Sequence, residues 1–255
     1  MGCNIYIITM GFLKTIKRKY INLNEYLFGG KNLKLSKKNI LITGSNSGIG
    51  LCIFKKITSD NNVLAFVNNN SDEVSKFKTN NSYIVKCDFS DISNLEKYNQ
   101  SIKDFKPNII INCAATFGDS TEIKNIDFEK YRKVLNINVL APVLIIQNSL
   151  ETNNLELILN ISSEMGSIDL NKTGNYYYYR SSKSLLNSFS KNLSIELKNK
   201  VNVYCVHPGN VKTKMNTGGI LNPEFAAQKI INICATNDNK LSGVLIDINK
   251  NILPW

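Results

Sequence analysis

The 255-residue sequence contains a single histidine, His207, and no Cys-x-x-Cys pair among its six cysteines. One imidazole cannot build a multi-histidine zinc site, and its position before Pro208-Gly209 indicates a structural role. We therefore expect no metal centre and no His-based catalytic triad. Most cysteines lie inside apolar segments, which favours buried free thiols over disulfides. Free thiols are typical of a reducing compartment, so a cytoplasmic location is expected.

Long apolar runs are also missing. Residues 5–13 are apolar, but a bilayer span takes about 20 residues, and no charged segment precedes this run as in a signal peptide. Acidic residues number 20 against 31 basic ones, which gives a net charge of +11. No nucleic-acid motif accompanies the lysine clusters at 14–19 and 31–38. We interpret the charge as spread over the surface, and expect neither a nucleic-acid partner nor membrane association.

From residue 39 onward, short apolar runs alternate with longer amphipathic stretches. The apolar runs predict strands at 39–43, 63–67, 83–87, 109–112, 155–161, 201–206 and 244–248. The amphipathic stretches predict helices at 49–58, 92–105, 131–150, 176–199 and 223–235, with Pro142 bending or breaking the third. This alternation predicts a single α/β domain over 38–255, a three-layer, doubly wound parallel sheet of Rossmann type. Residues 1–37 are an N-terminal extension of unknown role.

The first expected strand leads directly into a glycine-rich turn. Its residues are Thr43, Gly44, Ser45, Asn46, Ser47, Gly48, Ile49 and Gly50. Glycines here allow a tight turn and let backbone N–H groups approach a pyrophosphate, while the next helix directs its positive N-terminus at the phosphates. An ordinary strand-to-helix turn is the alternative. The strand before the motif and the helix after it favour a dinucleotide site.

Two further strand ends carry candidate cofactor contacts. Asp88 follows the third expected strand and can accept a hydrogen bond from an adenine amino group, or cap the next helix. The fourth strand ends in Asn112-Cys113-Ala114-Ala115, whose small side chains let the backbone approach a cofactor. Simple tight packing explains those small residues equally well.

Tyr179 and Lys183 stand four residues apart in YRSSK, so on a helix they share one face. A buried ammonium beside a phenol favours the phenolate and lowers the tyrosine pKa from about 10, which makes a proton donor usable near neutral pH. Tyr176 is the alternative, but its partner four residues on is Arg180, so Tyr179 is predicted. At least two of Tyr176, Tyr177 and Tyr178 are expected to pack.

These motifs occur in one order: TGSNSGIG, NCAA, the ISS of 161–163, YRSSK and the HPG of 207–209. Together they resemble the short-chain dehydrogenase/reductase family over residues 39–255. The long gap between Ser163 and Tyr179 and the final Pro-Trp are similar to the C-factor and Sniffer-like carbonyl reductase branch. The resemblance implies an NAD(P)-dependent oxidoreductase that transfers hydride between nicotinamide and a carbonyl or secondary alcohol.

The resemblance also implies a role for each motif residue. The implied catalytic residues are Asn138 for a relay water, Ser163 for the substrate oxygen, Tyr179 as general acid or base, and Lys183, which also holds the nicotinamide ribose. The implied cofactor contacts are Thr43, Gly44, Ser45, Ser47, Gly48, Ile49 and Gly50 at the phosphates, Asn68, Asp88, Asn112 and Ala114 at the adenosine, and Pro208, Gly209, Val211 and Thr213 at the nicotinamide.

The choice between NAD and NADP depends on charge near the adenosine ribose. Asn68 follows the second strand, where a basic residue would hold a 2′-phosphate and an acidic one would favour NAD. Ser47 stands where NADP-preferring members often carry a basic residue. Because no acid is present, NADP is favoured over NAD.

The substrate is expected to be a small carbonyl or alcohol, contacted by loops 165–178 and 214–221, while Glu164 is expected to be a solvated loop residue. A homodimer or homotetramer through the helices around Asn138 and Tyr179 is suggested by the family. A non-catalytic cofactor-binding regulator is the alternative function, although such proteins often lose the Tyr or Lys. A nucleotide-sugar-modifying relative is a second alternative, disfavoured by the short chain after Pro208.

Overall fold

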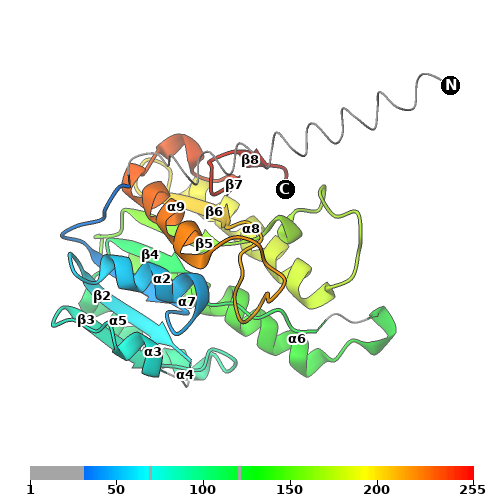
Figure 1. Ribbon diagram of the computed structural model, residues 1–255, viewed down its shortest axis with the longest axis horizontal. Coiled ribbons are helices and arrows are strands. Elements are labelled where there is room, and N and C mark those ends of the chain that lie inside the picture. The colour runs from blue at the N-terminus through cyan, green and yellow to red at the C-terminus, as the bar shows by residue number, and fades with distance from the viewer. Residues whose placement is uncertain (1–31, 69–70, 120–121) are drawn as a thin grey trace. The chain divides into compact units, whose positions relative to one another are not determined.

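The central sheet is made of short apolar strands, and β1, β4 and β5 are buried along almost their whole length. A computed structural model describes residues 32–68, 71–119 and 122–255, drawn as the coloured ribbon in Figure 1. The strands within these residues are β1 (Asn39–Thr43), β2 (Asn62–Val67), β3 (Ser82–Lys86), β4 (Ile109–Asn112), β5 (Leu157–Ile161), β6 (Asn202–His207), β7 (Leu245–Asp247) and β8 (Ile252–Leu253). Their order across the sheet is β3-β2-β1-β4-β5-β6-β7-β8.

Strands β1 to β7 run parallel, and β8 pairs with β7 in the antiparallel direction. In the centre, Leu41 stands opposite Leu64 on one side and Ile110 on the other. The predicted doubly wound α/β fold is therefore confirmed, and every predicted strand is present with ends moved by a residue or two. The antiparallel strand β8 was not predicted, because two residues are too few to show a period.

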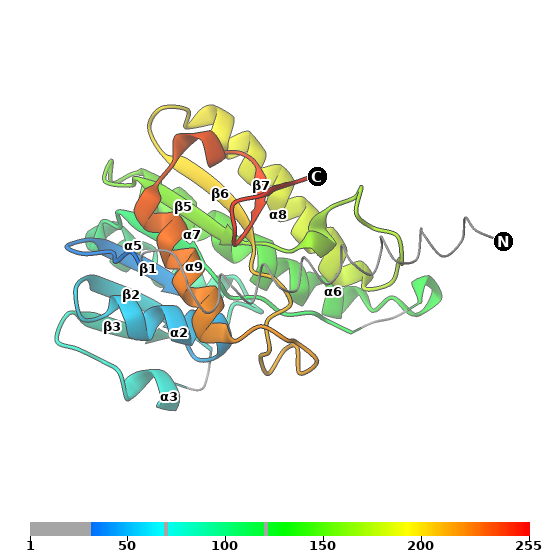
Figure 2. The same ribbon diagram turned by 45° about the horizontal axis from the view of Figure 1, so that its top comes forward.

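The helices lie in two layers, one on each face of the sheet. They are α2 (Gly48–Ile57), α3 (Asp72–Ser75), α4 (Ser93–Glu96), α5 (Asn99–Phe105), α6 (Phe128–Leu135), α7 (Ala141–Leu150), α8 (Tyr177–Glu196) and α9 (Pro223–Thr236), with the short turns η1 (Ile123–Asn125), η2 (Asn136–Leu140), η3 (Glu164–Gly166) and η4 (Asn239–Leu241). Figures 1 and 2 show α2 and α9 together on one face. Because strand side chains alternate, Ile42 packs under these two helices and Leu41 packs under α5, α7 and α8.

The helix predicted at 92–105 is instead two helices, α4 and α5, with a break at Lys97 and Tyr98. Tyr98 packs its ring edge-on against Phe66, 5.7 Å between centroids, and donates its hydroxyl to the carbonyl of Lys86. At Tyr98 the backbone leaves helical geometry, with φ −104° and ψ 6°. A tertiary contact thus overrides the local helical period.

The helix predicted at 131–150 starts earlier, at Phe128, and continues past Pro142 without a break. Pro142 has no N–H to donate to the carbonyl of Asn138 four residues back. The chain responds with one π turn, η2, in which Ala141 donates to the carbonyl of Asn136. Pro142 therefore shifts the hydrogen-bond register around Asn138 and does not end the helix.

Among the described residues, the segment Phe128–Leu150 alone reaches the length and apolarity of a membrane-crossing helix. Half of its most apolar window is buried inside the protein. Side chains such as Ile145 and Ile146 belong to the core beneath the sheet. Core helices commonly pass this test of length and composition, so the segment is assigned to the core.

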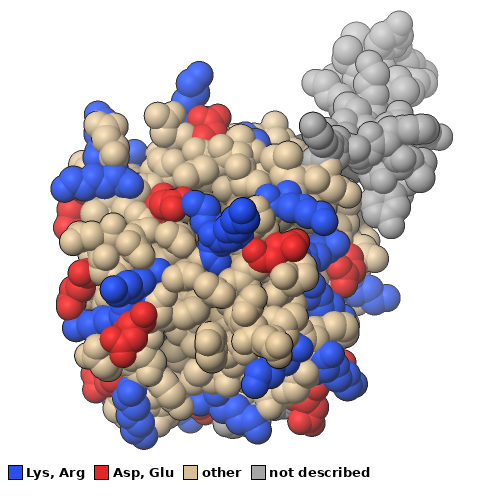
Figure 3. Space-filling model, turned by 90° about the vertical axis from the view of Figure 1, so that its left-hand side faces the viewer, with Lys and Arg blue, Asp and Glu red and all other residues tan. Residues whose placement is uncertain are grey.

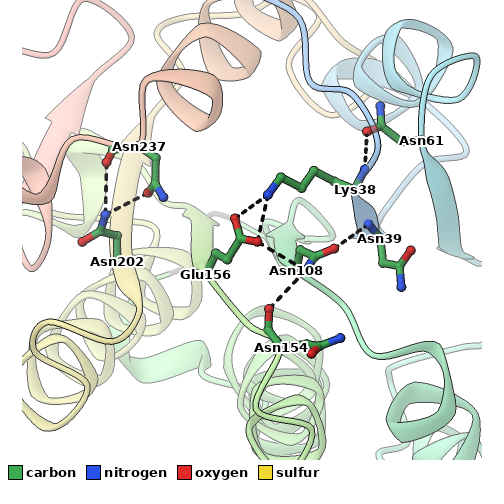
Figure 4. A network of polar contacts seen from close by, with 8 residues as sticks. All are labelled: Lys38, Asn39, Asn61, Asn108, Asn154, Glu156, Asn202 and Asn237. Atoms are coloured by element: carbon green, nitrogen blue, oxygen red, sulfur yellow. Dashed lines mark hydrogen bonds and ion pairs between the residues drawn. The ribbon is translucent and has the colours of Figure 1, made fainter.

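At the end of the sheet where the strands begin, asparagine side chains join neighbouring strands (Figure 4). Asn108 accepts from the backbone N–H of Asn39 at 2.9 Å and donates to the carbonyl of Asn154 at 3.2 Å. Lys38 donates to both carboxylate oxygens of Glu156, at 2.8 and 2.7 Å. These contacts satisfy backbone groups that the start of a parallel strand leaves unpaired.

The predicted extension, residues 1–37, lies mostly outside the described residues. Its last residues belong with the folded unit, which begins at Lys34. Leu35 is 7% exposed and packs in the core beside α2, and buried Asn61 donates to its carbonyl at 2.9 Å.

Charge and cysteines follow the sequence-based interpretation where the structure describes them. On the face shown in Figure 3, Lys and Arg side chains are interspersed with Asp and Glu, without a continuous patch of one sign. The cysteines of the described part are all free thiols. Four of them are buried: Cys52, Cys87, Cys205 and Cys234. Cys3 lies outside the described residues.

Candidate active site

The sheet order reverses between β1 and β4, and in such folds ligands bind beyond the carboxyl ends of the strands at that point. A cavity of about 520 Å³ lies there. Its walls come from the ends of β1 to β6 and from the loops that follow them. The predicted site residues that line it are Gly44, Ser47, Gly48, Ile49, Gly50, Asn68, Asp88, Ala114, Ser163, Tyr179, Lys183, Pro208, Gly209, Val211 and Thr213.

The glycine-rich turn is packed too closely for larger residues. Gly44 has φ +71°, and a Cβ there would meet the Cα of Ala114 at 2.8 Å. A Cβ on Gly50 would stand 2.3 Å from the carbonyl oxygen of Gly44. Ser47, the N-cap of α2, makes no side-chain capping bond, and the buried hydroxyl of Ser45 has no partner among the described residues. Backbone held this tightly, with free donors at a helix N-terminus, fits a dinucleotide pyrophosphate.

Four predicted residues lie beneath the cavity rather than on its wall: Thr43, Ser45, Asn112 and Asn138. Thr43 Oγ1 accepts from the backbone N–H groups of Cys113 and Ala114, both at 3.0 Å. Asn112 donates to the side-chain oxygen of Asn160 at 2.8 Å. Thr43 thus fixes the loop after β4 against β1, so that this residue supports the cavity floor.

Asp88 lies at the cavity with an additional local bond. Its Oδ1 accepts from the backbone N–H of Ser90 at 2.9 Å, which closes a turn after β3. The N-cap of α4 is Ile92, so Asp88 does not cap that helix. Asp88 also lines the cavity wall, as do Asn68 and Phe89.

Ser163, Tyr179 and Lys183 come together from two elements at one end of the cavity. Ser163 caps η3, its Oγ accepting from the backbone N–H of Met165 at 3.1 Å. Tyr179 and Lys183 share one face of α8, as their spacing predicted, and both are buried. The Lys183 ammonium donates to the carbonyl of Ile161 at 2.7 Å and lies 5.7 Å from the centroid of the Tyr179 ring.

Burial, not the neighbouring ammonium, controls the protonation of this pair. Burial raises the pKa of Tyr179 to about 12, while a hydrogen bond with Ser163 acts in the lowering direction. Burial lowers the pKa of Lys183 to about 8. The predicted lowering of the tyrosine pKa by Lys183 is therefore wrong for this structure, because desolvation of the phenolate outweighs any attraction to the ammonium.

Asn138 lies in the π turn with its side chain fully buried. It accepts from the backbone N–H of Thr116 at 2.8 Å and donates to the carbonyl of the same residue at 2.9 Å. It also donates to Ser182 Oγ on α8 at 2.9 Å. Asn138 therefore joins three elements around Tyr179: the loop after β4, the long helix and α8.

The tyrosines before Tyr179 differ in their surroundings. Tyr178 is buried, and its hydroxyl accepts from the backbone N–H of Asp127 at 2.8 Å. Tyr176 and Tyr177 are 38% and 41% exposed. Tyr178 therefore packs in the core, and Tyr176 packs its ring against Phe117, with centroids 5.8 Å apart.

Sequence reasoning missed the aromatic wall of the site. Phe117 stacks on the ring of Tyr179, with centroids 4.1 Å apart and planes inclined by 20°, and also meets the edge of the Tyr176 ring. No local signal marks Phe117, since the contact joins the loop after β4 to α8. Glu164 and His207 also line the cavity, with Oε2 and Nε2 3.7 Å apart. No cluster of three His, Cys, Asp or Glu side chains occurs in the part of the chain described.

Residues 38–220 match the family model of the short-chain dehydrogenases. The chain is also similar to 3-dehydrosphinganine reductase of Danio rerio, 26% identical over an alignment of 195 residues that covers 70% of this chain and 57% of that protein. This protein therefore belongs to the short-chain dehydrogenase family. It spans little more than half the length of the curated relatives it matches first.

Solved structures support the same fold. The chain resembles carbonyl reductase Sniffer of D. melanogaster with a TM-score of 0.77, at 23% identity, over 86% of this chain and 100% of that one. It also resembles NADPH-bound carbonyl reductase from chicken fatty liver, with a TM-score of 0.75 at 24% identity, over 87% and 100% of the two chains.

Proposed function

We propose that this protein is an NADP(H)-dependent oxidoreductase that reduces small carbonyl compounds to alcohols. The observation that carries this proposal is the meeting of Ser163, Tyr179 and Lys183 in the cavity that also holds the glycine-rich turn. Relatives named as carbonyl reductase and 3-dehydrosphinganine reductase support the reaction class. The intact Tyr–Lys pair favours an enzyme over a regulator that only binds the cofactor.

The chain's own residues divide the work at the substrate carbonyl. Ser163 and Tyr179 hold the substrate oxygen by hydrogen bonds, and the nicotinamide, when bound, supplies the hydride. With its pKa raised, Tyr179 is protonated at neutral pH and donates this proton to the oxygen as the carbonyl becomes an alcohol. Lys183 would hold the ribose next to the nicotinamide. Asn138 is assigned to the proton relay and keeps the loop at Thr116 in position.

Cofactor contacts follow the cavity wall. Gly44, Gly48 and Gly50 would bring backbone N–H groups to the pyrophosphate, and Asp88 and Ala114 would meet the adenosine half. The stretch from Pro208 to Thr213 would meet the nicotinamide half. NADP is preferred in this proposal because neither Val67 nor Asn68 supplies the acid that would favour NAD.

We further propose a cytoplasmic enzyme that forms a homodimer or homotetramer. The free thiols of the described residues support a reducing compartment. Leu140 and Leu185, on the helices around Asn138 and Tyr179, are 45% and 48% exposed and suit a helix-to-helix contact. Light scattering of the full chain, with Leu185→Asp as the disrupting variant, tests the assembly.

The reaction is tested with NADPH that carries two deuterium atoms at C4 and a panel of aldehydes and ketones. Each turnover should consume one NADPH and place one deuterium on the carbinol carbon of the product. If NADPH binds but no panel member is reduced, the non-catalytic alternative replaces this proposal. The panel must include many different carbonyl compounds, because loops 165–178 and 214–221 determine the substrate, and such loops vary freely on one scaffold.

A further inference from the structure

Hydrogen bonds hold the loop between β6 and α9 in a defined conformation, with Lys214 at its tip. Val211 and Leu221 form an isolated parallel bridge across its base. At the tip, Thr213 and Asn216 exchange backbone hydrogen bonds of 3.1 and 3.2 Å, and Asn216 also donates its side chain to the carbonyl of Val211. Lys214 is the second residue of this tight turn. Its backbone position is therefore set by the turn.

This turn lies against the phosphate end of the site. Figure 2 shows the orange loop extending beside one end of α2. The methyl group of Thr213 would be 3.1 Å from a Cβ on Gly48, the first residue of α2. Lys214, next in sequence, lines the same cavity as Ser47 and Asn68. Lys214 is therefore held on the wall of this cavity, next to the residue that approaches the first turn of α2.

The charges around α3 also relate Lys214 to the end of β2. Glu73 lies on α3, the first helix after β2. The pKa of its carboxylate is lowered by a hydrogen bond and the charge of Lys76, and further by Lys55 and Lys214. Lys214 therefore lies within electrostatic reach of the segment that follows β2. Lys76 is 2.6 Å from Glu73, so this acid is already paired and does not repel a phosphate strongly.

Other cations near the ribose side have different partners. Lys55 lies over the ring of Phe77, 4.3 Å from its centroid, and Lys76 pairs with Glu73. Lys183 is buried on α8 and donates to the carbonyl of Ile161, the last residue of β5. Among the described residues that line the cavity, Lys183 and Lys214 are the lysines, and no arginine joins them. Lys214 alone of the two is exposed to meet a ligand phosphate.

We infer that Lys214 recognises the 2′-phosphate of NADP(H) from the loop between β6 and α9. A lysine there supplies the positive charge that Ser47 and Asn68 lack, and reaches the phosphate across the cavity from β2. This inference rests on the proposed function, since it concerns the same cofactor site. It makes the loop that covers the substrate also responsible for choosing between NADP and NAD.

Cofactor binding to the full chain tests the inference without turnover. NADPH and NADH affinities are measured by their fluorescence for the wild type, Lys214→Gln and Lys214→Arg. Lys212→Gln is the matched control, because Lys212 is exposed on the same loop but does not line the cavity. Adenosine 2′,5′-bisphosphate and ADP serve as competing probes with and without the 2′-phosphate.

The expected result is a loss of NADPH affinity of about tenfold or more in Lys214→Gln, with NADH affinity changed less than about twofold. Lys214→Arg should keep the preference for NADPH over NADH, and Lys212→Gln should bind both cofactors like the wild type. Of the two competitors, only adenosine 2′,5′-bisphosphate should bind Lys214→Gln more weakly than it binds the wild type. An equal loss for NADPH and NADH would place Lys214 at the pyrophosphate and overturn the inference, as would no loss at all. If the wild type bound neither dinucleotide, the proposed function itself would fail, whatever the variants did.

Discussion

At the scale of single residues, burial determines what Tyr179 and Lys183 can do. The phenol is kept protonated because its anion would be desolvated, and the pKa rises to about 12. The ammonium of Lys183 loses water to the same burial, and its pKa falls to about 8. In the proposed reaction, Tyr179 would therefore be a ready proton donor. Carbonyl reduction would be favoured over alcohol oxidation, because oxidation needs the phenolate.

The raised pKa of Tyr179 predicts different pH profiles of kcat/KM for carbonyl reduction and alcohol oxidation. Because Tyr179 and Lys183 both remain protonated below their pKa values, kcat/KM for carbonyl reduction should change little between about pH 5 and pH 7. The phenolate population increases about tenfold per pH unit below that pKa, so kcat/KM for alcohol oxidation should rise with pH over the same range. Initial rates in both directions, on one substrate pair, measure this. Oxidation that is already at its plateau near pH 6 would contradict the raised pKa.

How much of the site was predictable depends on whether contacts are local. The spacing of Tyr179 and Lys183 on one helix, and the glycine turn after β1, are local patterns and were placed correctly in the structure. The stacking of Phe117 on Tyr179 joins residues far apart in the sequence, so no period reveals it. The direction of the Tyr179 pKa shift was wrong for the same reason, since burial is a property of the whole fold.

At the scale of elements, the turn from β1 into α2 carries the cofactor proposal. Its conformation depends on atoms that leave no room for a side chain at Gly50. Elsewhere, the structure differs from the local sequence pattern where tertiary contacts intervene. The helix predicted at 92–105 breaks where Tyr98 packs on Phe66. The helix predicted at 131–150 continues past Pro142 because one π turn accommodates the missing N–H donor. Strand positions were predicted well, because a buried parallel strand shows as a continuous apolar run.

Gly50→Ala should damage both the turn and its ligand site. The new Cβ would stand 2.3 Å from the carbonyl oxygen of Gly44, so the backbone of the turn must move. We expect a loss of about 2 kcal/mol in the free energy of unfolding and a weakening of NADPH binding of at least about tenfold. Gly218→Ala is the control, because a Cβ there meets nothing within 4 Å. Urea unfolding and fluorescence titration give the two numbers, and equal behaviour of the two variants would refute the role of the close contact.

At the scale of the whole molecule, parallel strands gather their functional residues at one end and their structural asparagines at the other. The cavity takes side chains from loops that follow six strands. The opposite end is tied by bonds such as Asn39 to Asn108 (Figure 4). Between the two ends lies a core that contains buried thiols. Cys205 and Cys234 are 1% and 2% exposed, and burial raises the pKa of each to about 12.

Because these thiols are buried, we predict that the free energy of unfolding decreases at alkaline pH. A thiol whose pKa is raised on folding contributes stability that is complete below its unfolded pKa, near 9, and is lost as the pH rises toward about 12. Each should remove about 1 kcal/mol per pH unit above pH 9. Lys183 acts in the opposite sense between about 8 and 10.5, since its pKa is lowered on folding, and between about pH 8 and pH 10 it offsets about two thiols. Burial also raises the pKa of Cys52 and Cys87 to about 11 and that of Cys113 to about 12, so the net change is still a loss of stability.

Urea unfolding at pH 8 and at about pH 10 measures this decline. The urea midpoint of the wild type should be lower at the higher pH, and Cys205→Ala should show a smaller decrease. A midpoint that is constant or increases with pH would show that the buried thiols do not control alkaline stability.

The central claim is that Tyr179 is the proton donor of a hydride-transfer site. The most direct measurement compares Tyr179→Phe and Tyr176→Phe for NADPH binding and for reduction of a carbonyl that the wild type accepts. Tyr179→Phe should lose at least about a hundredfold in kcat while binding NADPH within about twofold of the wild type. Tyr176→Phe should retain most of its activity, since Tyr176 has no lysine four residues on. Undiminished turnover in Tyr179→Phe, or a greater loss in Tyr176→Phe, would contradict the account.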